Sequence, residues 1–122
     1  MSEARPVVLV VDDDDLVARV LAAMLDELGY ESLVSYDGVD ALDQLETVGQ
    51  CFVAVLLDLS LPPIKGVSMT ELIRERVPSL PIILCSGASR AAMAAAGGDG
   101  ILAKPFHIDE LESVLSDVQR GA

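Results

Sequence analysis

The stretch FVAVLLDLSLPPIKG at residues 52–66 decides the fold of this chain. Its first part is a continuous apolar run, rich in valine and leucine, which predicts a buried strand over 52–59. Its second part, LPPIKG at 61–66, combines prolines with a glycine and predicts a loop. Asp58 stands at the end of the otherwise apolar strand. Because a carboxylate is rarely buried without a partner, Asp58 is the first candidate for a functional residue.

The rest of the chain repeats this alternation of apolar runs and helical patterns. Short apolar runs predict further strands at 7–11, 30–35, 80–85 and 101–103. Apolar residues at helical spacing predict helices over 16–28, 38–48, 67–77, 89–96 and 108–118. Five strand–helix pairs in this order predict an α/β fold. Its parallel sheet should be covered by helices on both faces and joined by right-handed crossovers.

Length and composition are consistent with this architecture. The chain has 122 residues, of which 52% are hydrophobic and only 3% aromatic. That length can bury one core without disulfides or a structural metal, so we expect a single domain over 1–122 with its core at about 6–119. The core must consist mainly of valine, leucine, isoleucine, alanine and methionine, which suits buried parallel strands.

The charge excludes some classes of partner. With 20 acidic against 8 basic residues the formal net charge is −12, so the chain lacks the clustered lysine and arginine of a nucleic-acid surface or of an anionic-membrane surface. No apolar stretch is long enough to span a bilayer, and the start MSEARPVV is no signal peptide. We expect a cytoplasmic protein. Cys51 and Cys85 both adjoin apolar runs and are expected to be buried free thiols.

Polar residues follow the predicted strands at the point where each strand ends. Asp12 and Asp13 follow the first strand, Asp58 ends the third, Ser86 follows the fourth and Lys104 follows the fifth. In open parallel sheets, ligands bind at the carboxyl ends of the strands. The sequence therefore predicts one functional edge of the sheet that carries all five side chains.

The four consecutive aspartates at 12–15 divide into two pairs with different tasks. Asp14 and Asp15 fall at the start of a predicted helix, where negative charge is favourable. Asp12 and Asp13 join Asp58 at the sheet edge, where three carboxylates repel unless a cation lies among them. Hard divalent cations take oxygen ligands, and Mg²⁺ pairs one or two carboxylates with phosphate oxygens. A carboxylate beside Mg²⁺ can attack phosphorus, and a lysine and a hydroxyl can meet the charge of the transferred group.

Four segments together resemble the receiver domains of bacterial two-component response regulators. They are VVDD (10–13), LLDLSLPPIKG (56–66), ILCSG (83–87) and AKPF (103–106), each at the expected strand end. The resemblance runs from about Val7 to Val118. It implies a flavodoxin-like (βα)5 fold with strand order 2-1-3-4-5. It also implies a signal-transduction protein that accepts a phosphoryl group from phosphohistidine in a phosphorelay and is not a conventional enzyme.

The resemblance also implies roles for individual residues. Asp58 matches the phospho-accepting aspartate, Asp12 and Asp13 match the acidic pair that holds Mg²⁺, and the backbone carbonyl of Ser60 matches the third protein ligand. We expect Asp13 rather than Asp12 to be the direct metal ligand.

The resemblance also implies roles for a serine and a lysine. Ser86 matches the hydroxyl residue that turns toward the phosphoryl group, and Lys104 matches the lysine that pairs with a phosphoryl oxygen. The Lys104–Pro105 peptide bond is expected to be cis, as in many relatives. His107, the only histidine, is expected to be a surface residue.

The implied partner is a histidine kinase or a histidine phosphotransfer domain, which in the family docks beside the first helix. The chain ends soon after the last predicted helix, so we expect no DNA-binding or catalytic output domain. We expect either a stand-alone receiver or a receiver from a larger chain such as a hybrid kinase.

The sequence departs from the family in two places. Ile101 stands three residues before Lys104, where the family commonly has an aromatic residue that moves with the hydroxyl residue. The segment between Ser86 and Lys104 is also shorter than usual, and Met93 is its only large apolar anchor. We expect a short fourth helix that is mobile or displaced. Output would then use a different face, or be absent.

Other functions compete with the receiver. DDDLV (13–17) fits the Asp-x-Asp-x-Val motif of haloacid-dehalogenase-like phosphatases, with Asp13 as nucleophile, but Gly98-Asp99-Gly100 supplies only one of the two further carboxylates required. A pseudo-receiver that only binds partners would not need a complete site. The presence of the full set therefore weighs against this alternative; the set is Asp12, Asp13, Asp58, Ser86 and Lys104. A flavin-binding domain would need a phosphate-binding loop after the first strand. The four aspartates at that position would repel the phosphate, which argues against this alternative.

Overall fold

The computed structural model describes residues 4–121, apart from the side chains of Gln50 and Arg90. Five parallel strands form one sheet in the order β2-β1-β3-β4-β5, as predicted. The strands are β1 (Val7–Val11), β2 (Glu31–Ser35), β3 (Phe52–Asp58), β4 (Ile82–Ser86) and β5 (Gly100–Ala103). The helices are α1 (Asp15–Glu27), α2 (Gly38–Val48), α3 (Met69–Arg76), α4 (Arg90–Ala95) and α5 (Ile108–Gln119), with a short 3-10 turn at Gly49–Cys51.

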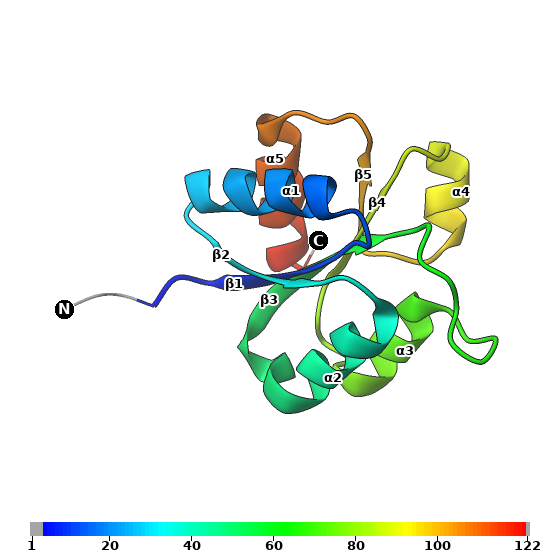
Figure 1. The fold of residues 1–122 in the computed structure, drawn as a ribbon. Helices are drawn as coiled ribbons and strands as arrows, with labels where there is room; N and C mark the ends of the chain where they lie inside the picture. The colour runs from blue at the N-terminus through cyan, green and yellow to red at the C-terminus, as the bar shows by residue number, and fades with distance from the viewer. Residues whose placement is uncertain (1–3, 122) are drawn as a thin grey trace.

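Helices cover both faces of the sheet, α1 and α5 on one and α2 and α3 on the other (Figure 1), and a separate hydrophobic core lies on each face. Alternate side chains of β1 enter opposite cores, as period-two geometry requires. Val8 and Val10 pack with α1 and α5, whereas Leu9 and Val11 pack with α2 and α3. The sheet is therefore buried on both sides, which explains why its central strands read as continuous apolar runs.

Side-chain caps fix where the helices begin. Asp14 accepts hydrogen bonds from the backbone N–H groups of Leu16 and Val17, so it caps α1 as the sequence predicted. Asp37, Ser68 and Ser89 cap the next three helices in the same way.

The fourth helix is short, as expected, and is held at one end. It has six residues, Arg90–Ala95, and its anchor Met93 is fully buried. Beyond it, Arg74 of α3 donates hydrogen bonds to the Gly97 carbonyl and to the Asp99 carboxylate. Asp99 also accepts a 2.8 Å hydrogen bond from the N–H of Ile82 at the start of β4. The turn after α4 is therefore tied to α3 and to the sheet.

The prediction for one of the two cysteines was wrong. Cys85 is buried, but Cys51 is exposed because it lies in the turn before β3 and not in the strand itself. Its position next to an apolar run did not place it in the core.

Of the helices described over residues 4–121, none combines the length and the apolar character needed to cross a bilayer.

Candidate functional site

The sheet register brings the ends of four strands to one edge. Asp58 lies opposite Cys85, and Ser86 lies opposite Ala103, the residue before Lys104. Asp12 follows β1, and its N–H donates to the carbonyl of Ser35 at the end of β2. Parallel pairing thus places residues from positions 12 to 104 side by side.

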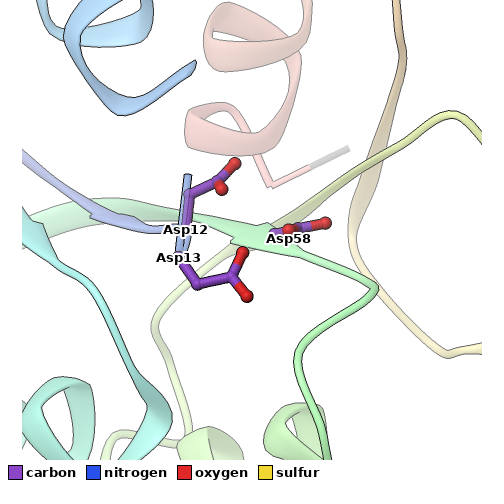
Figure 2. Close-up of side chains that lie close together, drawn as sticks. All are labelled: Asp12, Asp13 and Asp58. Atoms are coloured by element: carbon purple, nitrogen blue, oxygen red, sulfur yellow. The ribbon is translucent and has the colours of Figure 1, made fainter. Parts of the chain in front are cut away.

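Three carboxylates converge at this edge. Asp12, Asp13 and Asp58 each offer one oxygen within 4.8 Å of the others (Figure 2). Asp12 and Asp58 are buried, with residue exposures of 1% and 7%, while Asp13 is exposed. Two carboxylates therefore sit in a poorly hydrated position, and the third faces solvent beside them.

Lys104 is the cation of this cluster. Its Nζ lies 3.4 Å from Oδ2 of Asp12 and 3.9 Å from Oδ1 of Asp58. One positive charge thus faces two buried negative charges, and Asp13 adds a third. Asp12 uses its other oxygen, Oδ1, to accept a 2.9 Å hydrogen bond from the N–H of Asp14.

Asp58 is held through both oxygens by Ser60. The N–H of Ser60 donates to Oδ1 at 3.1 Å, and its hydroxyl donates to Oδ2 at 2.8 Å. The sequence predicted a backbone carbonyl ligand at Ser60 and did not predict this side-chain contact. The spacing of two residues after a strand-ending aspartate is a usable signal, because Asp and Ser form such local turns readily.

Ser86 lies on the neighbouring strand and is also buried, at 8% exposure. Its hydroxyl accepts a 3.0 Å hydrogen bond from the N–H of Ala88, and its carbonyl accepts a 2.8 Å bond from the N–H of Lys104. The Lys104–Pro105 bond is cis, as expected. The serine and the lysine are therefore connected through the backbone at the site edge.

The thiol of Cys85 lies beneath the site and plays no ionic part in it. Burial is the main cause that raises its pKa to about 12, the nearby carboxylates add to the effect and Lys104 opposes it. The thiol is therefore neutral at physiological pH. It contributes to the core shared with α1 and α5.

The donor set fits a hard divalent cation. All three acidic ligand atoms are carboxylate oxygens, and a single lysine leaves the cluster with excess negative charge. Oxygen-only ligation from two or three acidic residues suits Mg²⁺, which keeps several waters. Of the four consecutive aspartates, Asp12 and Asp13 lie in this cluster, Asp14 caps α1 and Asp15 is the first residue of that helix.

Other residues singled out by sequence lie elsewhere. Asp99 precedes β5, so it lies at the opposite edge of the parallel sheet, where it pairs with Arg74. It cannot supply the metal-binding carboxylate that a phosphatase based on Asp13 would need. His107 is exposed at the start of α5, as expected.

Comparison with known proteins shows which family this chain belongs to. The family model described as response regulator receiver domain matches residues 8–116. Response regulator MprA of Mycobacterium avium is 34% identical over 108 residues, which cover 85% of this chain and 46% of MprA. Sensor histidine kinase RcsC of Salmonella typhi is 34% identical over 116 residues, covering 89% of this chain and 12% of RcsC. The chain therefore spans less than half of each relative.

A solved structure agrees with the sequence relatives. The receiver domain of sensor histidine kinase PA1611 from Pseudomonas aeruginosa is 32% identical and superposes with a TM-score of 0.82. The match covers 98% of this chain and all of the other, and that structure has a magnesium ion coordinated in its active-site cleft.

Proposed function

This chain belongs to the response regulator receiver domain family, and from that premise we propose that it accepts a phosphoryl group on Asp58 from a phosphohistidine, with Mg²⁺ as cofactor. The observation that supports this most directly is the buried Asp58 carboxylate, which lies in one cluster with Asp12, Asp13 and Lys104. A carboxylate placed among charges in this way is oriented for reaction and not merely solvated.

The reaction we propose is a phosphoryl transfer between two side chains. A carboxylate oxygen of Asp58 forms a new P–O bond while the P–N bond of the phosphohistidine breaks. The released imidazole nitrogen takes up a proton from solvent, so atoms and charge balance. Hydrolysis reverses the state when water attacks phosphorus and frees the Asp58 carboxylate with inorganic phosphate.

Each neighbouring residue has a part in this transfer. Asp12, Asp13, Asp58 and the Ser60 carbonyl would hold Mg²⁺, which would neutralise charge on the incoming phosphoryl oxygens. Lys104, already 3.9 Å from Asp58, would pair with another phosphoryl oxygen. The Ser86 hydroxyl would leave the N–H of Ala88 and donate to the phosphoryl group, which adds nearly two negative charges at Asp58.

The phosphodonor would be a histidine kinase or a histidine phosphotransfer domain that docks beside α1. Two large apolar side chains of α1 support this placement, because Leu16 is 70% exposed and Val20 is 47% exposed. Leu16 follows the aspartates of the site directly in sequence. Exposed apolar residues beside a reactive group are typical of an interaction surface.

The decisive experiment is intact mass spectrometry after incubation with acetyl phosphate and Mg²⁺. We expect one phosphoryl adduct on the wild type and none on Asp58→Asn. The matched control Asp109→Asn, an exposed carboxylate on α5, should keep the adduct. Phosphate release is measured in the same samples, because rapid hydrolysis would hide an adduct. Absence of both would support a binding-only pseudo-receiver, and release that persists in Asp58→Asn would support a phosphatase based on Asp13.

A further inference from the structure

A groove on this protein lies away from the proposed phosphorylation site. It has a volume of about 530 Å³ and lies between α2 and the loop that joins β3 to α3. Both elements belong to the lower layer in Figure 1, on the face of the sheet opposite α1 and α5. The groove is therefore separate from the α1 surface proposed above for the phosphodonor.

One wall of the groove is acidic. Asp37, Asp40, Asp43 and Glu46 line it from α2, are all exposed, and follow one another at intervals of three residues. Glu46 pairs with Arg76, and Asp37 accepts the N–H of Asp40 as the helix cap. Among the side chains that the structure describes, Asp40 and Asp43 take part in no ion pair. Two carboxylates about 4.5 Å apart along the helix axis are thus available to an external cation.

The rest of the groove is formed by apolar side chains and by Arg76 of α3, whose guanidinium is already paired with Glu46. Leu42 and Ile64 line it, and Val39 at its mouth is 68% exposed. Ile64 is fixed by two backbone hydrogen bonds with Val67 across a tight turn in which Lys65 and Gly66 have positive φ. An exposed apolar residue beside a fixed apolar residue can bind an apolar side chain of a partner protein.

A second copy of this chain does not suit the groove. The protein has eight lysine and arginine residues, and at least six already pair with carboxylates of their own chain. A copy docked here would also bring part of a net charge of −12 against the acidic wall. Like charges across an interface are unfavourable, so the complementary occupant is a cationic segment of another protein.

We propose that this groove is a docking site for an amphipathic segment of another protein, with lysine or arginine side chains flanking an apolar anchor. The lysine or arginine side chains of the partner pair with Asp40 and Asp43, and its apolar anchor packs between Val39 and Ile64. The proposal concerns the unphosphorylated protein and does not depend on the function proposed for Asp58.

The test uses a synthetic helical peptide of lysine and leucine, labelled with fluorescein and titrated by anisotropy at 0.15 M salt. We expect the double variant Asp40→Asn/Asp43→Asn to weaken binding at least fivefold. The matched control Asp109→Asn/Glu112→Gln removes two exposed carboxylates at the same spacing on α5 and should change affinity less than twofold. If both pairs weaken binding equally, only the net charge attracts the peptide and the proposal is overturned.

A second arm tests the apolar seat. Val39→Ser should weaken binding severalfold, whereas Val48→Ser, at another exposed position of α2 outside the groove, should not. A peptide of the same charge with serine in place of leucine should bind more weakly. Equal affinity of the two peptides would show that no apolar anchor is seated. Amide shift changes should centre on residues 37–46 and 64, and changes spread over all acidic surfaces would contradict the groove.

Discussion

The hydroxyl of Ser60 donates a 2.8 Å hydrogen bond to Oδ2 of Asp58, and the N–H of the same residue bonds Oδ1 at 3.1 Å. One residue thus holds both oxygens of the proposed nucleophile. A hydrogen bond to a carboxylate orients the group and at the same time occupies one of the lone pairs of its oxygens.

Replacing Ser60 by alanine separates these two effects. Ser60→Ala keeps the backbone bond and loses the hydroxyl, so the free energy of unfolding should fall by about 1 kcal/mol. The freed oxygen should react a few times faster with acetyl phosphate, measured as the initial rate of adduct formation. Ser68→Ala, which removes the cap of α3, should lose similar stability without any gain in rate.

Removal of Lys104 should change metal binding and phosphorylation in opposite directions. Lys104 shares Asp12 and Asp58 with the proposed Mg²⁺, so Lys104→Gln should tighten Mg²⁺ binding about threefold to tenfold by removing a competing charge. The same variant should form less phosphoryl adduct, since a counter-charge is lost. Calorimetric titration measures the first effect and intact mass the second. Lys65→Gln, an exposed control, should leave both unchanged, and weaker Mg²⁺ binding by Lys104→Gln would argue against a shared site.

Mg²⁺ should stabilise the folded protein because it relieves the repulsion among three carboxylates. At a concentration one hundred times its dissociation constant, a ligand of the folded state adds about 2.7 kcal/mol to the free energy of unfolding. Asp13→Asn should be more stable than wild type without Mg²⁺ and should lose most of the gain with it. Urea unfolding followed by circular dichroism gives both values. A full Mg²⁺ gain in Asp13→Asn would exclude that residue as a ligand.

The two cysteines should differ in reactivity. Cys51 is exposed and should react with a thiol reagent in the native state, whereas Cys85 should react only after unfolding. Burial raises the pKa of Cys85 from 9.0 to about 12, so between these values the unfolded chain binds fewer protons at this thiol. The free energy of unfolding should therefore fall as pH rises above about 9. Cys85→Ala should show a shallower fall than Cys51→Ala, and equal slopes would contradict this assignment.

Gly98 should be intolerant of a side chain. A Cβ at this position would lie 2.7 Å from Cγ of the buried Leu84 and 3.2 Å from the carbonyl oxygen of Ile82. Gly98→Ala should cost about 1–3 kcal/mol, as overpacking usually does. At Gly87 a Cβ meets nothing within 4 Å, so Gly87→Ala is the matched control and should be nearly neutral. Chemical denaturation of the two variants measures the difference.

Much of the fold could be read from local signals in the sequence. The bounds of β1 and α2 agree with the predicted 7–11 and 38–48, because apolar runs and flanking cap or glycine residues mark both ends. The short fourth helix followed from Gly97 and Gly98. The predicted helix at 67–77 was too long, since Ser68 caps α3 and Met69 is its first residue.

The site was predictable where it depends on strand ends and not where it depends on contacts between side chains. Parallel topology alone places Asp12, Asp58 and Lys104 at one edge. The Ser60 hydroxyl contact depends on how the chain turns after β3, which periodicity does not encode. Exposure of Leu16 was equally out of reach, because helical spacing identifies apolar positions but does not say whether anything covers them.

The 92-residue separation between Asp12 and Lys104 has a consequence for how the protein forms. During synthesis the four aspartates emerge early, whereas their neutralising lysine arrives with the last strand. Closing such a long loop carries a large entropic cost that later contacts must recover. A chain that has not yet added β5 therefore holds its acidic cluster without the lysine, so a divalent cation bound as proposed would also assist folding before the domain is complete.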